Sequence, residues 1–216
     1  MKKSLLIYCY DSYCGWCFGF SEVMKNIEEA YKSVLDFEVL SGGMILPEKP
    51  VHINATADYI SKAYQVVEET SGVKFGSDFL WHIFNPHESD WYPNSEKPAI
   101  ALCILKEYFP EKAIEFSAAL QYALFVEGRD LTDDEAYRHL LKEYSIDEND
   151  FYQKLHSQSY KDVAHSEFAI VKKLQVEGFP ALYLQTTENK FYFIANGYTK
   201  EEIVRQNLNK ILELSQ

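Results

Sequence analysis

Two cysteines near the start of the chain are the residues whose type and spacing could do chemistry. Cys14 and Cys17 enclose Gly15 and Trp16 in a CxxC motif, a spacing that lets two thiols act in turn on one disulfide. Only the thiolate is nucleophilic, and the N-terminus of a helix favours it through unpaired N–H groups and the helix dipole. We therefore expect Cys14 to be an exposed attacking thiol. Cys17, one turn deeper and shielded, would then release the mixed disulfide.

The four cysteines could also serve other purposes. A structural zinc site needs about four ligands, and the scattered histidines supply no second pair, so no metal site is expected. A structural or chance CxxC remains an alternative. Cys9 and Cys103 lie inside apolar segments and are expected to be inert core residues, although Cys9 is close enough to the motif to leave a redox role open.

A proline late in the chain is the second feature. Pro180 follows Gly178 and Phe179 and stands at the beginning of an expected strand, a position that is unusual for a central strand. A cis Phe179–Pro180 bond in a tight turn would explain it. An ordinary trans proline is the alternative from the local sequence.

Three residues beside the cysteines could support the chemistry. Asp11 could cap or solvate its loop, or accept protons, although its charge would raise the pKa of Cys14. Trp16 could contact substrate next to the disulfide or simply pack against the protein. Neither Gly15 nor Trp16 carries a charge that would strongly stabilise a thiolate, so an extreme oxidant is not expected.

The elements that position the motif follow from hydrophobic periodicity. The apolar run Leu5–Tyr10 predicts a buried strand, and apolar residues at helical spacing from Phe18 onward predict a helix. A second strand is expected over Phe37–Ser41, ended by Gly42–Gly43. The CxxC motif would thus lie between a strand and a helix. Capping residues predict three further helix starts, at Ser95, Thr132 and Thr199.

The remainder of the chain predicts the fold class. Residues 44–176 show helical patterns and no convincing strand, whereas Ala181–Gln185 and Phe191–Ile194 indicate a hairpin that precedes a final helix. This order predicts an α/β fold in which one mixed sheet carries a large all-helical insertion. We expect residues 1–43 with 177–216 to form the sheet domain and 44–176 the inserted helical domain.

Composition limits the partners. Acidic residues exceed basic ones by 33 to 21, giving a net charge of −12, which opposes binding to nucleic acid or to an anionic membrane surface. No apolar run reaches the length of a membrane span. A cytoplasmic protein that acts on protein or small-molecule disulfides and thiols is expected. The oligomeric state is not indicated.

The run from Asp11 to Phe20 resembles the active-site signature of the DsbA family of the thioredoxin superfamily, and is most similar to its cytoplasmic disulfide-isomerase and FrnE-like branch. Gly178-Phe179-Pro180 is similar to the family's cis-proline loop. Glu127–Asp130 and Asn94–Ser95 resemble stretches of its helical domain. The resemblance implies a thioredoxin-like mixed sheet with a helical insertion.

For the site, the resemblance implies that Cys14 is the nucleophile and Cys17 the resolving thiol. It also implies that the Phe179–Pro180 bond is cis, with the Phe179 backbone pairing with substrate. Tyr8 stands where many relatives keep a buried acid, which leaves the proton acceptor of Cys17 unidentified. Ser12 replaces the proline of the usual motif, a departure from which we expect little effect.

The function expected from these observations is a disulfide reductase or isomerase. No cofactor is expected beyond the cysteine pair, with glutathione open as a co-substrate. One alternative is a glutathione-dependent isomerase or transferase of the 2-hydroxychromene-2-carboxylate isomerase or kappa-class type. Those proteins generally lack the cysteine pair, so Cys14 and Cys17 argue against it. Another is a non-catalytic adaptor on the same fold.

Overall fold

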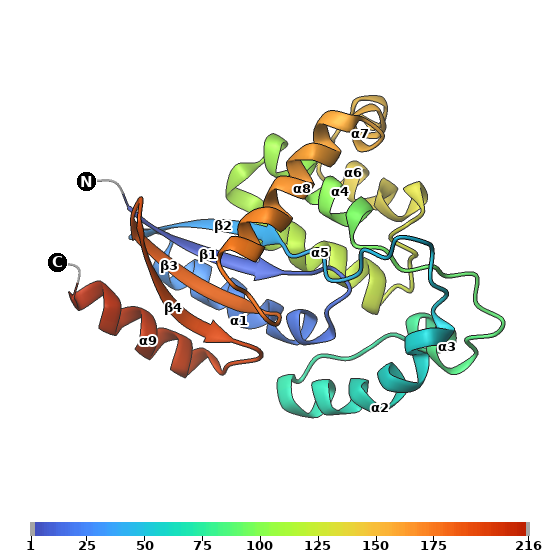
Figure 1. Ribbon diagram of the computed structural model, residues 1–216, viewed down its shortest axis with the longest axis horizontal. Coiled ribbons are helices and arrows are strands. Elements are labelled where there is room, and N and C mark those ends of the chain that lie inside the picture. The colour runs from blue at the N-terminus through green and yellow to red at the C-terminus, as the bar shows by residue number, and fades with distance from the viewer. Residues whose placement is uncertain (1–2, 215–216) are drawn as a thin grey trace.

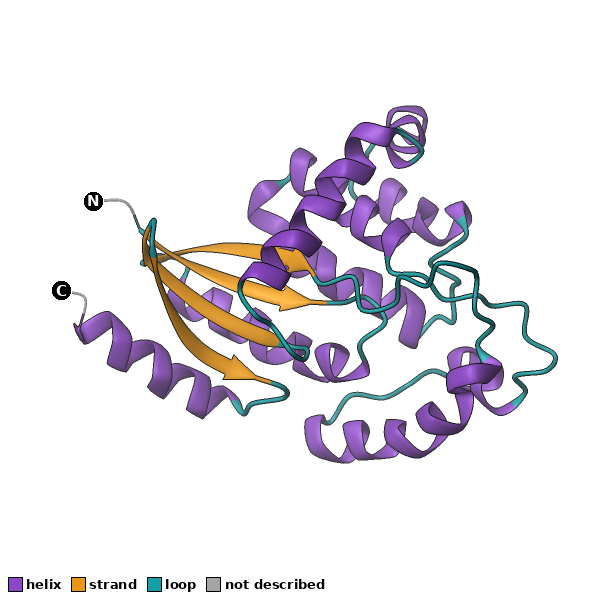
Figure 2. Ribbon diagram, viewed as in Figure 1, coloured by secondary structure: helices purple, strands orange, loops and turns teal. Residues whose placement is uncertain are grey.

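The computed structural model describes residues 3–214 and, within them, contains one four-stranded sheet in the order β2-β1-β3-β4 (Figure 2). The strands are β1 (Ser4–Tyr10), β2 (Leu35–Ser41), β3 (Ala181–Thr187) and β4 (Lys190–Asn196). β1 pairs in parallel with β2 and antiparallel with β3, and β3 and β4 form an antiparallel hairpin. This mixed sheet with helical segments between β2 and β3 confirms the predicted fold class.

The central strand β1 is buried on both faces, which explains its continuous apolar sequence. Leu6, Tyr8 and Tyr10 belong to the main core, and the alternate residues Ile7 and Cys9 belong to a smaller cluster on the other face.

Helices cover both faces of the sheet (Figure 1). α1 (Gly15–Tyr31) supplies Met24 and Ile27 to the main core, to which α9 (Glu201–Leu214) also contributes. The C-terminal part of α8 (Gln158–Lys173) covers the opposite face through Val171. No helix within residues 3–214 combines the length and the apolar character that crossing a membrane requires.

Between β2 and β3 the described chain contains helices and loops but no strand. Besides α8, the elements are α2 (Asn54–Ser71), α3 (Ser77–Phe84), α4 (Glu96–Tyr108), α5 (Ala113–Phe125), α6 (Arg138–Glu143) and α7 (Glu148–Leu155), with 3-10 turns at Pro110–Lys112 and Asp134–Tyr137. The short α3 was not expected from the sequence.

Aromatic rings join the helical segments to the sheet side of the molecule. The ring of Phe18 on α1 lies 5.3 Å from Phe75 and 5.2 Å from Phe125 on α5. One main core therefore includes residues from both sides of the expected boundaries. Domain boundaries at 44 and 176 stay a prediction.

Two expected capping side chains, those of Thr132 and Thr199, do not cap a helix in the structure. Asp133, not Thr132, caps the turn that follows it, because its carboxylate accepts from Glu135 N. The hydroxyl of Thr199 donates to the Gly197 carbonyl instead of capping α9. Four of the apolar residues that recur at helical spacing in the sequence are exposed, namely Val34, Tyr59, Val66 and Ile203.

Candidate active site

The cysteine pair lies at the first turn of α1. Cys14 is the N-cap residue, with φ −84° and ψ 108°, and α1 begins at Gly15, three residues before the expected Phe18. The Cys14 sulfur accepts a hydrogen bond of 3.2 Å from the backbone N–H of Cys17. A sulfur at this position receives both an unpaired helix N–H group and the positive end of the helix dipole. All four cysteines are free thiols in the structure.

The two sulfurs differ in their surroundings. Cys14 is only 6% exposed, so the expectation of an exposed thiol is wrong, but it lines the wall of an open cavity. Cys17 is fully buried, as the sequence predicts. Burial raises the pKa of Cys17 well above its ordinary value, and its hydrogen bond and charge interaction with Cys14 raise it further. Cys14 therefore reaches the cavity, whereas Cys17 does not.

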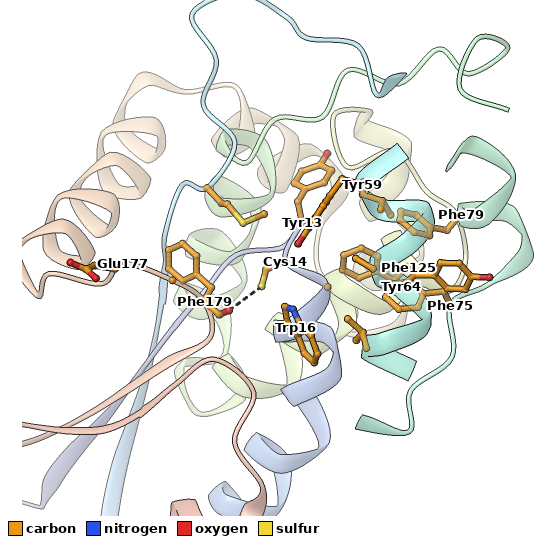
Figure 3. Close-up of a pocket in the computed structure, with 16 residues that line it drawn as sticks. Tyr13, Cys14, Trp16, Tyr59, Tyr64, Phe75, Phe79, Phe125, Glu177 and Phe179 are labelled. Atoms are coloured by element: carbon orange, nitrogen blue, oxygen red, sulfur yellow. Dashed lines mark hydrogen bonds between the residues drawn. The ribbon is translucent and has the colours of Figure 1, made fainter. Parts of the chain in front are cut away.

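The loop before β3 brings a backbone oxygen to the sulfur. The Phe179–Pro180 bond is cis, and the Cys14 thiol donates to the Phe179 carbonyl across 3.6 Å (Figure 3). Pro180 is buried, does not line the cavity, and accepts a hydrogen bond of 2.7 Å from Gly197 N. Contacts of this loop with substrate would thus be made by Glu177, Gly178 and Phe179, which line the cavity, and not by Pro180.

A glycine at the end of β2 makes room for the Phe179 ring. A Cβ atom added to Gly42 would lie 1.9 Å from Phe179 Cζ. Since real Cβ atoms do not approach other carbons so closely, only glycine fits here with the ring in place. The sequence predicts that Gly42 ends the second strand, but it does not indicate this contact with Phe179.

Asp11 is a buried anchor for the loop that precedes the motif. It is 1% exposed, so it does not solvate the loop. Its carboxylate accepts from Tyr13 N at 3.0 Å, Met44 N at 2.7 Å and the Ser95 hydroxyl at 2.9 Å. Burial raises the pKa of Asp11 despite these hydrogen bonds, which lower it. Ser95 stands before α4 as expected, but its hydroxyl serves Asp11 instead of capping the helix.

Gln121 holds the same loop from the helical side and was missed in the sequence. Its side-chain N–H group donates to the carbonyls of Asp11, at 3.2 Å, and Cys14, at 3.4 Å. It is 1% exposed on the buried helix α5. A glutamine inside a largely apolar helical run was the available signal, because buried polar groups need a partner.

Tyr8 lies on β1 beside the buried Cys17. The ring is 1% exposed, and its hydroxyl has no hydrogen-bond partner within ordinary limits among the described residues. Burial raises the pKa of Tyr8 well above 10.0, and the neighbouring Cys17 and Cys14 raise it further. A phenol that stays protonated can donate a hydrogen bond to a thiolate but cannot accept the proton that the thiol releases.

Cys14 opens on a cavity of about 320 Å³ lined mainly by apolar side chains. Gly15 and Trp16 form part of its wall, and the Trp16 ring also lies 6.1 Å from Tyr198. Trp16 therefore both packs against the protein and faces the cavity. The other aromatic lining residues are Tyr13, Tyr59, Tyr64, Phe75, Phe79, Phe125 and Phe179.

The remaining cysteines lie away from this cavity. Burial raises the pKa of Cys9 to about 12 and that of Cys103 still higher, and the Cys103 thiol donates to Glu167 at 3.4 Å. Such groups are inert toward disulfides. Within residues 3–214 no three His, Cys, Asp or Glu side chains are grouped so that they could hold a metal ion.

Comparison with known proteins places these features in context. Residues 6–208 match the family model of the DSBA-like thioredoxin domain. A candidate protein disulfide isomerase from Nitrosomonas europaea superposes with a TM-score of 0.86, at 27% identity over 99% of both chains. The cytosolic disulfide reductase DsbM from Pseudomonas aeruginosa gives a TM-score of 0.76, at 21% identity over 97% of this chain and 99% of DsbM.

One curated relative is an adapter protein. The ClpXP adapter protein SpxH of Bacillus subtilis (strain 168) is 20% identical over 190 residues, which is 88% of this chain. The matched region spans 61% of the length of SpxH.

Proposed function

Since the chain belongs to the DSBA-like thioredoxin domain family, we propose that it is a disulfide reductase or isomerase that works through Cys14 and Cys17. Family membership and the disulfide-oxidoreductase neighbours support thiol–disulfide oxidoreductase chemistry in general. The observation that carries the finer proposal is the position of the Cys14 sulfur. It lies at the N-terminus of α1, 3.2 Å from Cys17 N and 3.6 Å from the Phe179 carbonyl, on the wall of a cavity.

The reaction proceeds by two exchanges. The Cys14 thiolate attacks one sulfur of a substrate disulfide, so a Cys14–substrate disulfide forms, the substrate bond breaks and the first thiolate leaves. Cys17 then loses its proton and attacks the Cys14 sulfur, which releases the second substrate thiol and leaves a Cys14–Cys17 disulfide. The substrate gains two electrons and the protein loses two. A thiol reductant such as glutathione would restore the dithiol.

The surrounding groups assist each exchange. The Phe179 carbonyl, which accepts from Cys14 before reaction, would accept a backbone N–H from the bound substrate once Cys14 is engaged. Asp11 and Gln121 hold the loop that carries Cys14. Tyr8 would donate a hydrogen bond to the Cys17 thiolate as it forms. The proton of Cys17 would pass to the departing substrate thiolate, since Tyr8 cannot accept it.

The direction we propose is reduction or isomerisation in the cytoplasm. The cavity wall beside Cys14 carries no Lys or Arg among the described residues that would stabilise the thiolate strongly. A cytosolic glutathione pool keeps ordinary dithiols reduced. The structural similarity to a cytosolic disulfide reductase supports the same direction.

Turnover of a protein disulfide in a reduced glutathione buffer tests this proposal. The wild-type chain should reduce insulin or reshuffle a scrambled disulfide protein well above the uncatalysed rate, and Cys14→Ser should abolish the gain. Equal rates for the wild type and Cys14→Ser would refute the proposal. Cys9→Ser is the matched control, because Cys9 is buried away from the cavity.

Two relatives bear on the co-substrate and on an alternative function. DsbM has been solved with GSH, which keeps glutathione open as the thiol that restores the dithiol of this chain. SpxH is an adapter. A second candidate function is therefore the binding of a partner protein independently of the redox state of Cys14. Binding of a partner equally by wild type and by a Cys14→Ser, Cys17→Ser protein would favour the adapter.

A further inference from the structure

The cavity beside Cys14 has two chemically different sides, and from them we infer the substrate that it selects. The substrate is a peptide disulfide with an aromatic residue on one side of its cysteine and a basic residue on the other. Anionic disulfides such as oxidised glutathione are disfavoured. The inference rests on the proposed function, because it concerns the disulfide that Cys14 attacks.

One side of the cavity is an aromatic box formed by Tyr64, Phe75, Phe79 and Phe125. Phe75 lies 5.6 Å from Phe79, 5.3 Å from Phe125 and 6.0 Å from Tyr64, measured between ring centroids. The three phenylalanines are at most 8% exposed, so their positions are fixed by packing. These rings gather on one side of the Cys14 sulfur (Figure 3).

The size of the cavity suits one side chain. A volume of about 320 Å³ is at the small end of ligand pockets, which span roughly 300–1,000 Å³. An aromatic side chain next to the attacked cysteine would bury its ring among rings that favour edge-to-face contacts. A flexible aliphatic or charged group would gain less from the same walls.

The other side carries a single charge. Glu177 is exposed and is the only charged residue lining the cavity within the described part of the chain. Figure 3 shows it beyond Phe179, on the opposite side of Cys14 from the aromatic box. A basic residue of the substrate would meet this carboxylate, whereas an acidic one would be repelled by it.

Charge also argues against glutathione as the preferred disulfide. Each glutathionyl group carries two carboxylates and only one ammonium, and no Lys or Arg lines the cavity among residues 3–214 to pair with the carboxylates. Moving an unpaired carboxylate out of water is costly. The net charge of −12 further lowers the encounter rate with anions.

Single-turnover kinetics of the reduced full-length chain test this selection. The probes are the symmetrical disulfides of acetyl-Phe-Cys-Lys-amide, acetyl-Phe-Cys-Glu-amide and acetyl-Gly-Cys-Lys-amide, together with oxidised glutathione and bis(2-hydroxyethyl) disulfide. Each rate constant is divided by the rate constant of the same disulfide with free N-acetylcysteine amide. We expect the normalised rate constant of the Phe-Cys-Lys probe to exceed that of oxidised glutathione at least tenfold. It should exceed those of the other two peptides by a smaller factor.

Two variants separate the contributions of the two sides. Glu177→Lys should reverse the order of the Lys and Glu peptides, while the exposed Glu188→Lys, outside the cavity, should not. Ala63→Phe places a ring in the cavity and should remove the advantage of Phe over Gly peptides. The exposed Ala30→Phe on α1 is its control.

The outcomes distinguish this inference from the proposed function. Rapid reaction with bis(2-hydroxyethyl) disulfide, but equal normalised rates for all peptides and for glutathione, would overturn the inference and leave the exchange activity standing. Faster reaction with oxidised glutathione than with the Phe-Cys-Lys probe would also overturn it. If none of the disulfides reacts faster with the wild-type chain than with Cys14→Ser, the proposed function itself fails.

Discussion

The Ser95 hydroxyl donates a hydrogen bond of 2.9 Å to Asp11 Oδ1, joining residues 84 positions apart in the chain. Asp11 lies in the loop before Cys14, and Ser95 stands before α4. Ser95 Oγ also accepts from Ile45 N at 3.0 Å. One serine therefore ties the cysteine loop, the segment after β2 and the helical region to each other.

Replacing this serine should cost stability. Ser95→Ala leaves a buried carboxylate oxygen and a backbone N–H without this partner, and such losses cost about 1–3 kcal/mol. Urea unfolding measures the free energy. The exposed Ser33→Ala is the control and should change it by less than about 0.5 kcal/mol. Equal effects of the two variants would show that the contact contributes nothing.

Asp11 should make stability fall with rising pH. Burial holds its folded-state pKa above the unfolded value, which is about 3.9. The contribution of such a carboxyl is fully present below the unfolded pKa and is lost as the pH rises through the folded pKa. The free energy of unfolding of wild type minus that of Asp11→Asn should therefore decrease from about pH 3.5 toward neutrality. A difference that increases with pH would contradict the shift.

Gln121 should act as a positioning residue for Cys14. Gln121→Met keeps the side-chain length but leaves the Asp11 and Cys14 carbonyls without this donor, a loss of about 1–3 kcal/mol in unfolding free energy. If the loop shifts, the rate of mixed-disulfide formation at Cys14 should also fall severalfold, with the rate measured at several pH values. The exposed Gln153→Met is the matched control. An unchanged rate with lowered stability would restrict Gln121 to a structural role.

Gly42 should tolerate no side chain. Gly42→Ala places a methyl group 1.9 Å from Phe179 Cζ, and overpacking of this kind costs about 1–3 kcal/mol. The ring must move, and the Phe179 carbonyl near Cys14 is expected to move with it, so disulfide exchange should slow. Gly178→Ala is the control for unfolding, since its added Cβ would meet only Asn196 Oδ1 at 3.8 Å. Equal losses of unfolding free energy in the two variants would refute the assignment.

Local patterns accounted for much of the fold and for the two central residues. The runs around β1 and α1 have clear periodicities, and CxxC between them located Cys14 and Cys17. The eight residues of α3 were missed because so short a segment gives a weak helical pattern beside a loop.

Contacts between distant segments were not readable from the sequence. Gln121 reaches Cys14 across 107 positions, and Phe179 meets Gly42 from another element. The expected exposure of Cys14 was wrong for the same reason, because the cavity wall includes residues of α2 and α5 that no local pattern places beside it.

The division of labour between the two sulfurs is the central claim, and mass spectrometry of quenched single turnovers tests it most directly. With a peptide disulfide, the reduced wild-type chain should release two thiols and end as the Cys14–Cys17 disulfide. Cys17→Ala should stop after one released thiol with the peptide bound to Cys14, and Cys14→Ala should release none. A peptide attached to Cys17, or full release by Cys14→Ala, would contradict the account.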